Sequence, residues 1–286
     1  MGKIIVVANQ KGGVAKTTTA VNLAAFLGSY GKSVLLIDLD PQANATSGIG
    51  LNRDDIQKGI YEVLIEKETL ESTILSSPSP GVVVCPAQLS LVGAEIELVY
   101  AVRRENRLKQ ALDKNDSKNR YDFIIIDTPP SLGLLTLNAF TAADSVLIPM
   151  QCEYYALEGL AQLYKTIQLV KQKTNPSLNV EGLLFSMVDP RVNLTLQVME
   201  EVRKSLKDKV YETTIPRNVR LAEAPSFGKP ILLYDKTSKG AEAYERLAKE
   251  FLARCETATP SAPVVMTDTI PSPIQNEANA QEVTPP

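Results

Sequence analysis

Residues 4–19 read IIVVANQKGGVAKTTT, an apolar run that breaks into two glycines and continues into a helix-forming segment. The apolar run predicts a strand, and the residues from Thr18 to Tyr30 predict a helix. A turn of this kind aims backbone N–H groups and the amino end of a helix at one point, which favours an anion. The segment therefore predicts a phosphate-binding loop of a size that suits a nucleoside triphosphate.

Two side chains in this loop predict how a triphosphate is held. Lys16 would neutralise the β and γ phosphates, and the Thr17 hydroxyl would complete the coordination of Mg²⁺, which prefers oxygen ligands. The strict pattern GxxxxGK[ST] fails at Gln10 and Ala15, which replace its first and last glycines. The alternative, a Gly-Gly turn with two incidental lysines, is disfavoured by the strand and helix signals on either side.

The replacement at Ala15 has two interpretations. If the backbone there has a positive φ angle, alanine costs about 1 kcal/mol relative to glycine. If Ala15 is the first helical residue, alanine costs nothing. We favour the second interpretation.

The shorter pattern KGGxxKT is that of the deviant Walker A loop, and four motifs together resemble the ParA/Soj family of partition ATPases within the MinD/ParA superfamily. They are NQKGGVAKTTTAVNLA (9–24), LLIDLDPQANAT (35–46), FIIIDTPPSLGLLTLNAF (123–140) and IPRNVRLAEAPSFGKPI (215–231). The motifs follow the family order, and the resemblance extends from residue 4 to about residue 254. It implies an α/β P-loop NTPase fold and Mg²⁺-dependent ATP hydrolysis.

Composition limits the chemistry that the chain can perform. The 286 residues include no histidine, which removes the commonest general base and metal ligand. Cys85, Cys152 and Cys255 form no CxxC pair, so neither a disulfide framework nor a zinc ribbon is indicated. Hydrolysis would therefore use carboxylates, lysines and magnesium.

The chain divides into a long body and a short tail. Residues 256–286 contain six prolines, four acids, no lysine or arginine and no aromatic residue, which predicts a disordered acidic tail. Residues 1–255 form one predicted ATPase domain, which keeps all 30 basic residues and loses four of the 33 acidic ones, for a net charge of about +1. Because no apolar stretch reaches the roughly 18 residues that a bilayer requires, and no signal-peptide core precedes the loop, we expect a cytoplasmic protein.

Apolar runs of strand length alternate with segments of helical period along the body. Predicted strands are Lys3–Ala8, Ser33–Leu39, Val82–Pro86, Asp122–Asp127, Ser145–Met150, Glu181–Val188 and Val210–Ile215. Predicted helices are Thr17–Tyr30, Leu89–Leu112, Leu134–Ala142, Leu157–Lys173, Leu194–Leu206 and Gly240–Cys255. Nearly continuous apolar strands separated by helices indicate an α/β fold with a mostly parallel central sheet and helices on both faces.

Carboxylates follow two of these strands, at the edge where ligands bind in parallel sheets. Asp127 ends the run FIII as a Walker B carboxylate does, and it would hold Mg²⁺ directly or through water. The resemblance makes Asp40 the residue that orients the attacking water. For Asp38, a role around Mg²⁺ or Thr17 and a role in merely ending the strand both stay open. Residues 127–130 would form a switch that responds to the γ phosphate.

The resemblance also implies a role for Lys11, the first lysine of the loop. In the resembled family, the lysine at this position reaches the phosphates bound by a second copy of the chain. It therefore implies an ATP-bound homodimer with Lys11, Lys16 and Asp40 as catalytic residues. The predicted ATP-binding residues are Lys11, Gly12, Gly13, Val14, Ala15, Lys16, Thr17 and Thr18 around the phosphates, and Met187, Pro216, Arg217 and Asn218 around the adenine.

A DNA-binding role rests on the last third of the body. Residues 185–230 contain eight basic and six acidic residues, and a dimer would double this weak positive bias. Arg191 and Arg220 match positions that the family uses for nonspecific double-stranded DNA, where phosphate contacts add up. The alternative is that these arginines are ordinary solvated charges on the protein surface. Since the first strand begins at residue 3, we expect no helix-turn-helix segment before it and no sequence-specific operator binding.

The sequence thus predicts a cytoplasmic, nucleoid-associated ATPase that segregates chromosome or plasmid DNA with a ParB/Spo0J-type centromere-binding partner. A MinD-like membrane ATPase is the alternative, but its carboxyl-terminal basic amphipathic helix has no counterpart in the proline-rich tail. An iron protein of the nitrogenase type would need two cysteines near the switch segments. The related tyrosine kinases are disfavoured because no tyrosine follows Tyr244.

Overall fold

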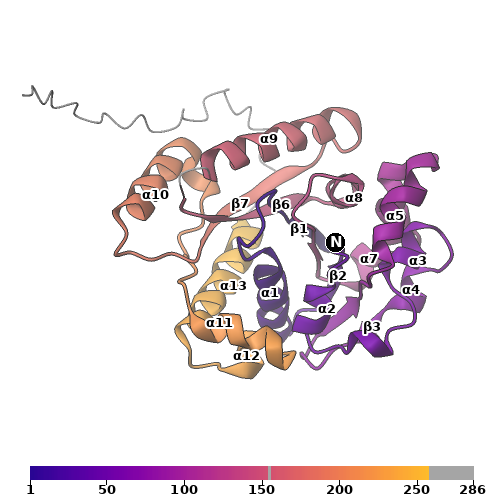
Figure 1. The fold of residues 1–286 in the computed structure, drawn as a ribbon, viewed down its shortest axis with the longest axis horizontal. Helices are drawn as coiled ribbons and strands as arrows, with labels where there is room; N and C mark the ends of the chain where they lie inside the picture. The colour runs from indigo at the N-terminus through magenta and orange to yellow at the C-terminus, as the bar shows by residue number, and fades with distance from the viewer. Residues whose placement is uncertain (154–155, 258–286) are drawn as a thin grey trace, which may run out of the picture.

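The computed structural model describes residues 1–153 and 156–257. Its centre is a seven-stranded sheet in the order β3-β4-β2-β5-β1-β6-β7 (Figure 1). Neighbouring strands are parallel, except that β3 runs antiparallel to β4. The strands are β1 (Lys3–Val7), β2 (Val34–Asp38), β3 (Leu75–Ser76), β4 (Val82–Cys85), β5 (Phe123–Asp127), β6 (Ser145–Gln151) and β7 (Asn179–Ser186). The predicted α/β fold with a mostly parallel sheet is confirmed.

The central strands are apolar on both faces because each face meets a core of its own. Along β1, Ile4 and Val6 belong to one buried cluster, whereas Ile5 and Val7 belong to the other. Successive side chains of a strand point to opposite faces, so a strand between two helical layers has no position for an exposed polar residue. The continuous apolar runs in the sequence follow from this geometry.

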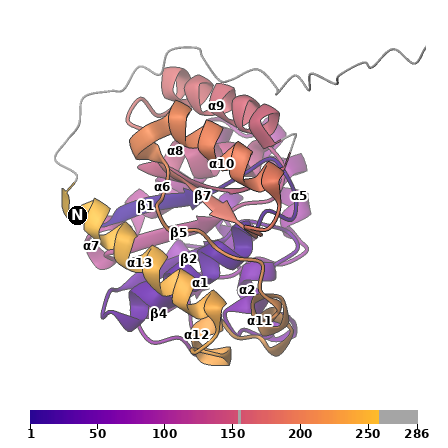
Figure 2. The same cartoon turned by 90° about the vertical axis from the view of Figure 1, so that its left-hand side faces the viewer.

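Helices cover both faces of the sheet (Figures 1 and 2). One layer packs against the face of the sheet that carries Ile5. It consists of α1 (Lys16–Ser29), α2 (Asn44–Gly48), α11 (Val219–Glu223), α12 (Ile231–Tyr234) and α13 (Lys239–Thr257). The other layer packs against the opposite face, which carries Ile4. It consists of α3 (Ile60–Leu64), α4 (Leu70–Thr73), α5 (Leu91–Glu97), α6 (Arg107–Lys114), α8 (Leu134–Ala142), α9 (Ala156–Lys173) and α10 (Asn193–Leu206). A further short helix is α7 (Ser117–Arg120). Among the described helices, none is long and apolar enough to cross a membrane.

Two predicted elements differ from the structure. The predicted strand 210–215 is wrong, because only isolated bridges join Val210 to Leu183 and Pro216 to Val188. Between these bridges, the backbone N–H groups of residues 212 and 213 donate to the Glu250 carboxylate instead of to a strand. The predicted helix 89–112 is broken between α5 and α6, where Arg103 has a φ of 54°.

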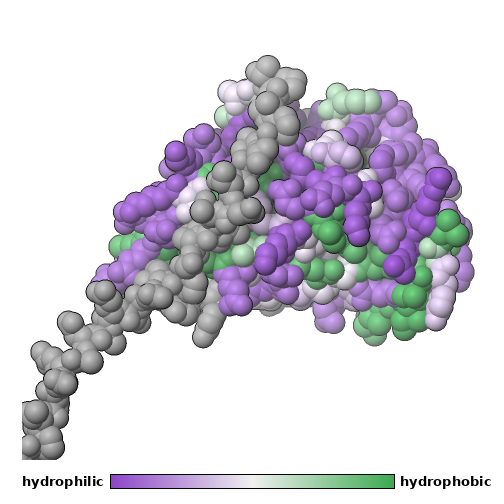
Figure 3. Space-filling view, turned by 90° about the horizontal axis from the view of Figure 1, so that it is seen from above, coloured by the Kyte–Doolittle hydropathy of each residue, from purple (hydrophilic) through white to green (hydrophobic). Residues whose placement is uncertain are grey.

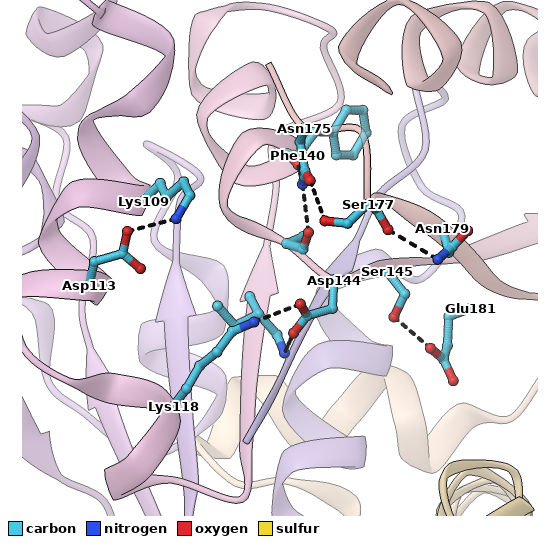
Figure 4. A network of polar contacts seen from close by, with 12 residues as sticks. Lys109, Asp113, Lys118, Phe140, Asp144, Ser145, Asn175, Ser177, Asn179 and Glu181 are labelled. Carbon is cyan, nitrogen blue, oxygen red and sulfur yellow. Dashed lines mark hydrogen bonds and ion pairs between the residues drawn. The ribbon is translucent and has the colours of Figure 1, made fainter. Parts of the chain in front are cut away.

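A polar network fixes the amino ends of the strands, away from the loop that precedes α1 (Figure 4). Asp144 accepts hydrogen bonds from the Ile4 backbone N–H at 2.8 Å and from Lys118 Nζ at 2.6 Å. Ser145 donates to Glu181 at 2.5 Å, which joins β6 to β7. These contacts tie β1, β6 and β7 together at one edge, so the polar groups at the opposite edge remain available for a ligand.

The packing of α13 on the sheet generates a stability prediction. Phe251 is fully buried and meets Phe123 edge-on, with ring centroids 5.3 Å apart. Phe251→Ala should lower the free energy of unfolding by about 3–5 kcal/mol in urea titrations, because it removes a large buried side chain and leaves a cavity. Phe227→Ala is the matched control, since Phe227 is 62% exposed, and an equal loss from both variants would contradict this account.

Candidate nucleotide site

Three loops meet at the carboxyl edge of the sheet because three strands pair in register there. Asp127 at the end of β5 lies opposite Val7 of β1 on one side and opposite Asp38 of β2 on the other. The residues that follow each strand therefore come out side by side, as ligand sites in parallel sheets require. Figure 2 shows this edge and the loop before α1 at the opposite end of the molecule from the amino terminus.

The loop before α1 reverses the chain through positive φ angles at Gly13 (74°) and Ala15 (64°). Ala15 is the residue that caps α1, and its carbonyl accepts a hydrogen bond from the Thr19 N–H at 2.9 Å. The interpretation of Ala15 as the first helical residue is therefore wrong, since the helix begins at Lys16. An alanine in this left-handed conformation costs about 1 kcal/mol relative to glycine.

Residues that the sequence analysis missed hold this loop in place. Asn9 accepts a hydrogen bond from the Lys11 N–H at 3.0 Å and donates to the Pro149 carbonyl at 2.7 Å. Gln151 donates to the Gly13 carbonyl at 2.8 Å, and Ser186 donates to the Val14 carbonyl at 3.0 Å. Gln151 is the last residue of β6, and Ser186 is the last residue of β7. Because ligand sites in parallel sheets lie at the ends of the strands, these positions could have indicated both residues.

The two loop lysines differ in their surroundings. Lys16 is buried, and its Nζ donates to the Lys11 carbonyl at 3.1 Å, at the mouth of the loop. Burial lowers the pKa of Lys16, against the opposing effect of the Asp127 and Asp40 carboxylates. Lys11 is partly exposed, and its Nζ forms an ion pair with Glu153 of the same chain. Exposed pairs of this kind contribute about 0–1 kcal/mol, so separation of Lys11 from Glu153 would cost little.

The two predicted metal ligands lie in contact. Thr17 Oγ1 donates to Asp127 Oδ2 at 2.7 Å, and Asp127 Oδ1 is a buried oxygen with no hydrogen-bond partner among the described residues. Burial raises the pKa of Asp127 well above its usual range, and the neighbouring Asp38 carboxylate raises it further. A carboxylate oxygen without a partner beside a hydroxyl suits a hard cation, so these residues fit Mg²⁺.

The loop after β2 is organised by Asp38. Its carboxylate accepts hydrogen bonds from the Thr46 N–H and hydroxyl, both at 2.7 Å, and from the Asp40 N–H at 3.1 Å. Burial raises the pKa of Asp38 to about 6. None of these bonds involves Thr17, so Asp38 shapes the loop that carries Asp40. Asp40 itself is buried, and its Oδ1 accepts the Gln42 N–H at 2.9 Å.

The segments predicted to surround the adenine lie together. The Val188 N–H donates to the Ile215 carbonyl at 2.9 Å, and the Arg217 N–H donates to the Val188 carbonyl at 3.3 Å. This pairing brings Met187 beside the Pro216 to Asn218 segment. Gln151 connects Met187 to the phosphate loop, because its Nε2 lies 2.8 Å from both Met187 Sδ and the Gly13 carbonyl. Asn218 Oδ1 accepts a hydrogen bond from the Leu221 N–H and caps α11, which leaves the side-chain Nδ2 to donate.

Arg191 and Arg220 are both exposed, and both already form ion pairs. Arg191 makes two hydrogen bonds to Asp189, at 2.9 and 2.7 Å, and these lower the pKa of Asp189 to about 2. Arg220 pairs with Glu223 at 2.9 Å and with Asp235 at 3.4 Å. Arg191 lies two residues before α10, and Arg220 is the second residue of α11. Both helices lie on the side of the molecule that Figure 2 faces.

The predicted domain boundary falls inside a helix. Glu256 and Thr257 belong to α13 rather than to a tail. The rest of the predicted tail, residues 258–286, lies outside the described residues.

Known proteins resemble this chain over most of its length. Residues 2–180 match the family model described as an AAA domain. The sporulation initiation inhibitor protein Soj of Bacillus subtilis is 57% identical over 253 residues, which are 88% of this chain and 99% of that protein. The chromosome partitioning protein ParA of Myxococcus xanthus is 54% identical over 92% of this chain and 91% of its own length.

A solved structure extends the likeness to the fold. The crystal structure named as cobyrinic acid a,c-diamide synthase from Mycobacterium smegmatis, with bound ADP and magnesium, has a TM-score of 0.78 and is 38% identical, covering 90% of this chain and 96% of that one. The fold and the loop before α1 thus define a P-loop ATPase. Within that class, the chain belongs to the ParA/Soj family.

The positive φ at Ala15 predicts that glycine stabilises the fold at this position, whereas glycine usually destabilises it elsewhere. Ala15→Gly should raise the free energy of unfolding by up to about 1 kcal/mol, because relief of the left-handed strain exceeds the added flexibility of the unfolded chain. Ala253→Gly, at an exposed position of α13, is the control and should lower it by about 1 kcal/mol. Urea titration checks both values. A clear loss of stability in Ala15→Gly would contradict the strain assignment.

Proposed function

We propose that this chain is a Mg²⁺-dependent ATPase that dimerises on binding ATP, binds double-stranded DNA nonspecifically and segregates chromosome or plasmid DNA with a ParB-type partner. The observation that carries the proposal is the Thr17 to Asp127 contact at 2.7 Å, with a second, unpartnered Asp127 oxygen beside it. This contact supports the proposal, because two oxygens beside the phosphate loop suit a cation.

In the proposed nucleotide complex, Thr17 and Asp127 hold Mg²⁺, directly or through water. When bound, the ion would neutralise charge on the phosphate oxygens. Lys16 adds a positive charge at the same point, and its burial strengthens that charge's effect because little water screens it. The backbone N–H groups from Gly12 to Thr18 complete the anion site at the amino end of α1.

Asp40 is the proposed residue that orients the attacking water. Its backbone N–H is held by Asp38 and its Oδ1 by the Gln42 N–H, so the carboxylate has a fixed direction. A carboxylate held in this way is able to accept a proton from water positioned next to the phosphate. The buried Lys16 is close enough for its charge to interact with Asp40.

Replacement of Asp40 tests this assignment. Asp40→Ala should reduce ATP turnover by about a hundredfold or more, the typical contribution of a positioned base, while ATP binding is retained. Phosphate release and fluorescent-nucleotide titration measure the two properties separately. Asp54→Ala is the matched control, since Asp54 is exposed in the turn after α2. Turnover within threefold of the unmodified chain would exclude Asp40 from this role.

Lys11 supports the proposed dimer because the phosphates of its own chain already have Lys16. The exposed pair with Glu153 keeps Lys11 at the surface rather than in its own loop. We propose that Lys11 leaves Glu153 and binds the phosphates of a second copy when ATP is present. A lysine supplied in this way would make hydrolysis depend on dimerisation, as an arginine finger does.

The proposed DNA surface consists of Arg191 and Arg220. Their ion pairs are exposed, and exposed pairs contribute little, so a phosphate competes effectively for each guanidinium. Phosphate contacts are individually weak and add up, so two copies would bind DNA much more tightly than one. ATP-dependent dimerisation would therefore switch DNA binding on.

The charge of Arg220 provides the test. Arg220→Glu should reduce ATP-dependent retention of nonspecific DNA by at least tenfold at moderate salt, because repulsion replaces a phosphate contact, whereas the ATP-dependent dimer should persist. Lys114→Glu makes the same charge change at an exposed position of α6 and should leave retention unchanged. DNA pull-down and sedimentation measure the two properties. Undiminished retention by Arg220→Glu would show that DNA binds elsewhere.

The relatives named as chromosome partitioning proteins support the proposed cellular role. We propose that the ATP-bound dimer associates with the nucleoid in the cytoplasm and is released when a ParB/Spo0J-type centromere-binding protein stimulates hydrolysis. The partner's DNA would be the cargo.

A further inference from the structure

One side chain, Gln151, contacts both halves of the proposed nucleotide site. Its Nε2 lies 2.8 Å from the Gly13 carbonyl oxygen in the phosphate loop, and 2.8 Å from Met187 Sδ beside the predicted adenine segment. A side-chain amide nitrogen carries two hydrogens, so one is available for each contact. The orientation of the Gln151 amide therefore depends on where the Met187 side chain lies.

The carbonyl that Gln151 holds controls a donor of the phosphate loop. The peptide unit between Gly13 and Val14 is planar and trans, so the Val14 N–H points away from the Gly13 carbonyl. Ser186 donates to the Val14 carbonyl at 3.0 Å and orients the Ala15 N–H in the same way. Two N–H groups of the proposed anion site thus take their direction from Gln151 and Ser186.

Met187 has an unusual backbone conformation. It follows Ser186, the last residue of β7, and its φ angle is 52°. A positive φ is uncommon outside glycine, and it persists only where the surrounding contacts determine it. The Val188 N–H donates to the Ile215 carbonyl at 2.9 Å and fixes the chain directly after Met187. Because the backbone is fixed, a ligand at this position would act on the Met187 side chain.

The segment that carries Gln151 also contacts the rest of the phosphate loop. The Pro149 carbonyl accepts a hydrogen bond from Asn9 at 2.7 Å, and Glu153 pairs with Lys11. Three alternate positions, 149, 151 and 153, therefore meet the loop before α1. A change at Gln151 would bear on the same loop that holds Lys11.

We propose that Gln151 is a positioning residue that makes phosphate binding depend on the adenine base. The inference rests on the proposed function and adds to it a connection between the two ends of the nucleotide. A base packed against Met187 fixes the thioether, which fixes the Gln151 amide, which in turn holds the Gly13 carbonyl. A triphosphate without the base meets a loop that is held less firmly.

The first test uses inorganic triphosphate with Mg²⁺, a ligand that has no base to contact Met187. Met187→Ala should weaken its binding to the full chain by about threefold, because the Gln151 amide loses one of its two contacts. In a chain that already carries Gln151→Met, the same change should have no effect, since methionine offers Gly13 no donor. Displacement of a fluorescent nucleotide measures each dissociation constant.

The second test compares two ligands in one variant. Gln151→Met should weaken inorganic triphosphate by about fivefold, the size of one lost hydrogen bond. It should weaken ATP by about three times more, because only ATP carries the base whose contact Gln151 transmits. A side chain that merely stiffens the loop would affect both ligands equally.

The matched control is Gln162→Ala, at an exposed position of α9. Figure 3 views the molecule from the side on which Figure 1 places α9, and much of the coloured surface there is hydrophilic. The loss of a glutamine side chain from this surface should leave the affinity for ATP and for inorganic triphosphate within about twofold of the unmodified chain.

Two outcomes would overturn the inference while leaving the proposed function intact. One is a Met187→Ala chain that binds inorganic triphosphate as tightly as the unmodified chain does. The other is an equal loss of ATP and inorganic triphosphate in Gln151→Met. An unmodified chain that does not bind ATP in the presence of Mg²⁺ would overturn both the inference and the proposed function.

Discussion

The in-register pairing of β5 between β1 and β2 is the constraint on which the rest of the site depends. It places Asp127 level with Val7 and Asp38, so three loops leave the sheet at one height. The pairing is specified by the two cores, since a shift of β5 by one residue would turn each of its side chains to the opposite face of the sheet. The chemistry at the edge is therefore positioned by hydrophobic burial rather than by the polar residues themselves.

That arrangement brings two carboxylates into a buried place, which is electrostatically unfavourable. Asp38 is stabilised by three hydrogen bonds from its own loop, whereas Asp127 receives only the Thr17 hydroxyl in the described structure. Buried charge without full compensation is a source of instability that a bound cation relieves. The difference between the two residues explains why one shapes a loop and the other suits a metal.

Features carried by contiguous residues were predictable from the sequence. The phosphate loop, Asp127 and Asp40 stand beside apolar runs that mark strand ends, so their common location follows from the fold. Gln151 and Ser186 were not predictable in the same way, because their contacts with the loop join residues more than 130 positions apart. Ala15 was misjudged because its φ is set by the reversal of the chain into α1. The strand 210–215 was misjudged because Glu250, on α13, takes the backbone donors that a strand would use.

The ion pair of Lys11 with Glu153 has a further consequence for charge balance. If each lysine moves to the other copy, two Glu153 carboxylates lose their counterions near the new contact, so the assembled pair carries negative charge that the separate chains had neutralised. Dissolved salt screens such charge and also loosens the original ion pair. Salt also weakens contacts between arginine and DNA phosphate. Under the proposed function, added salt would therefore ease the release of Lys11 from Glu153 and weaken the DNA contacts at the same time.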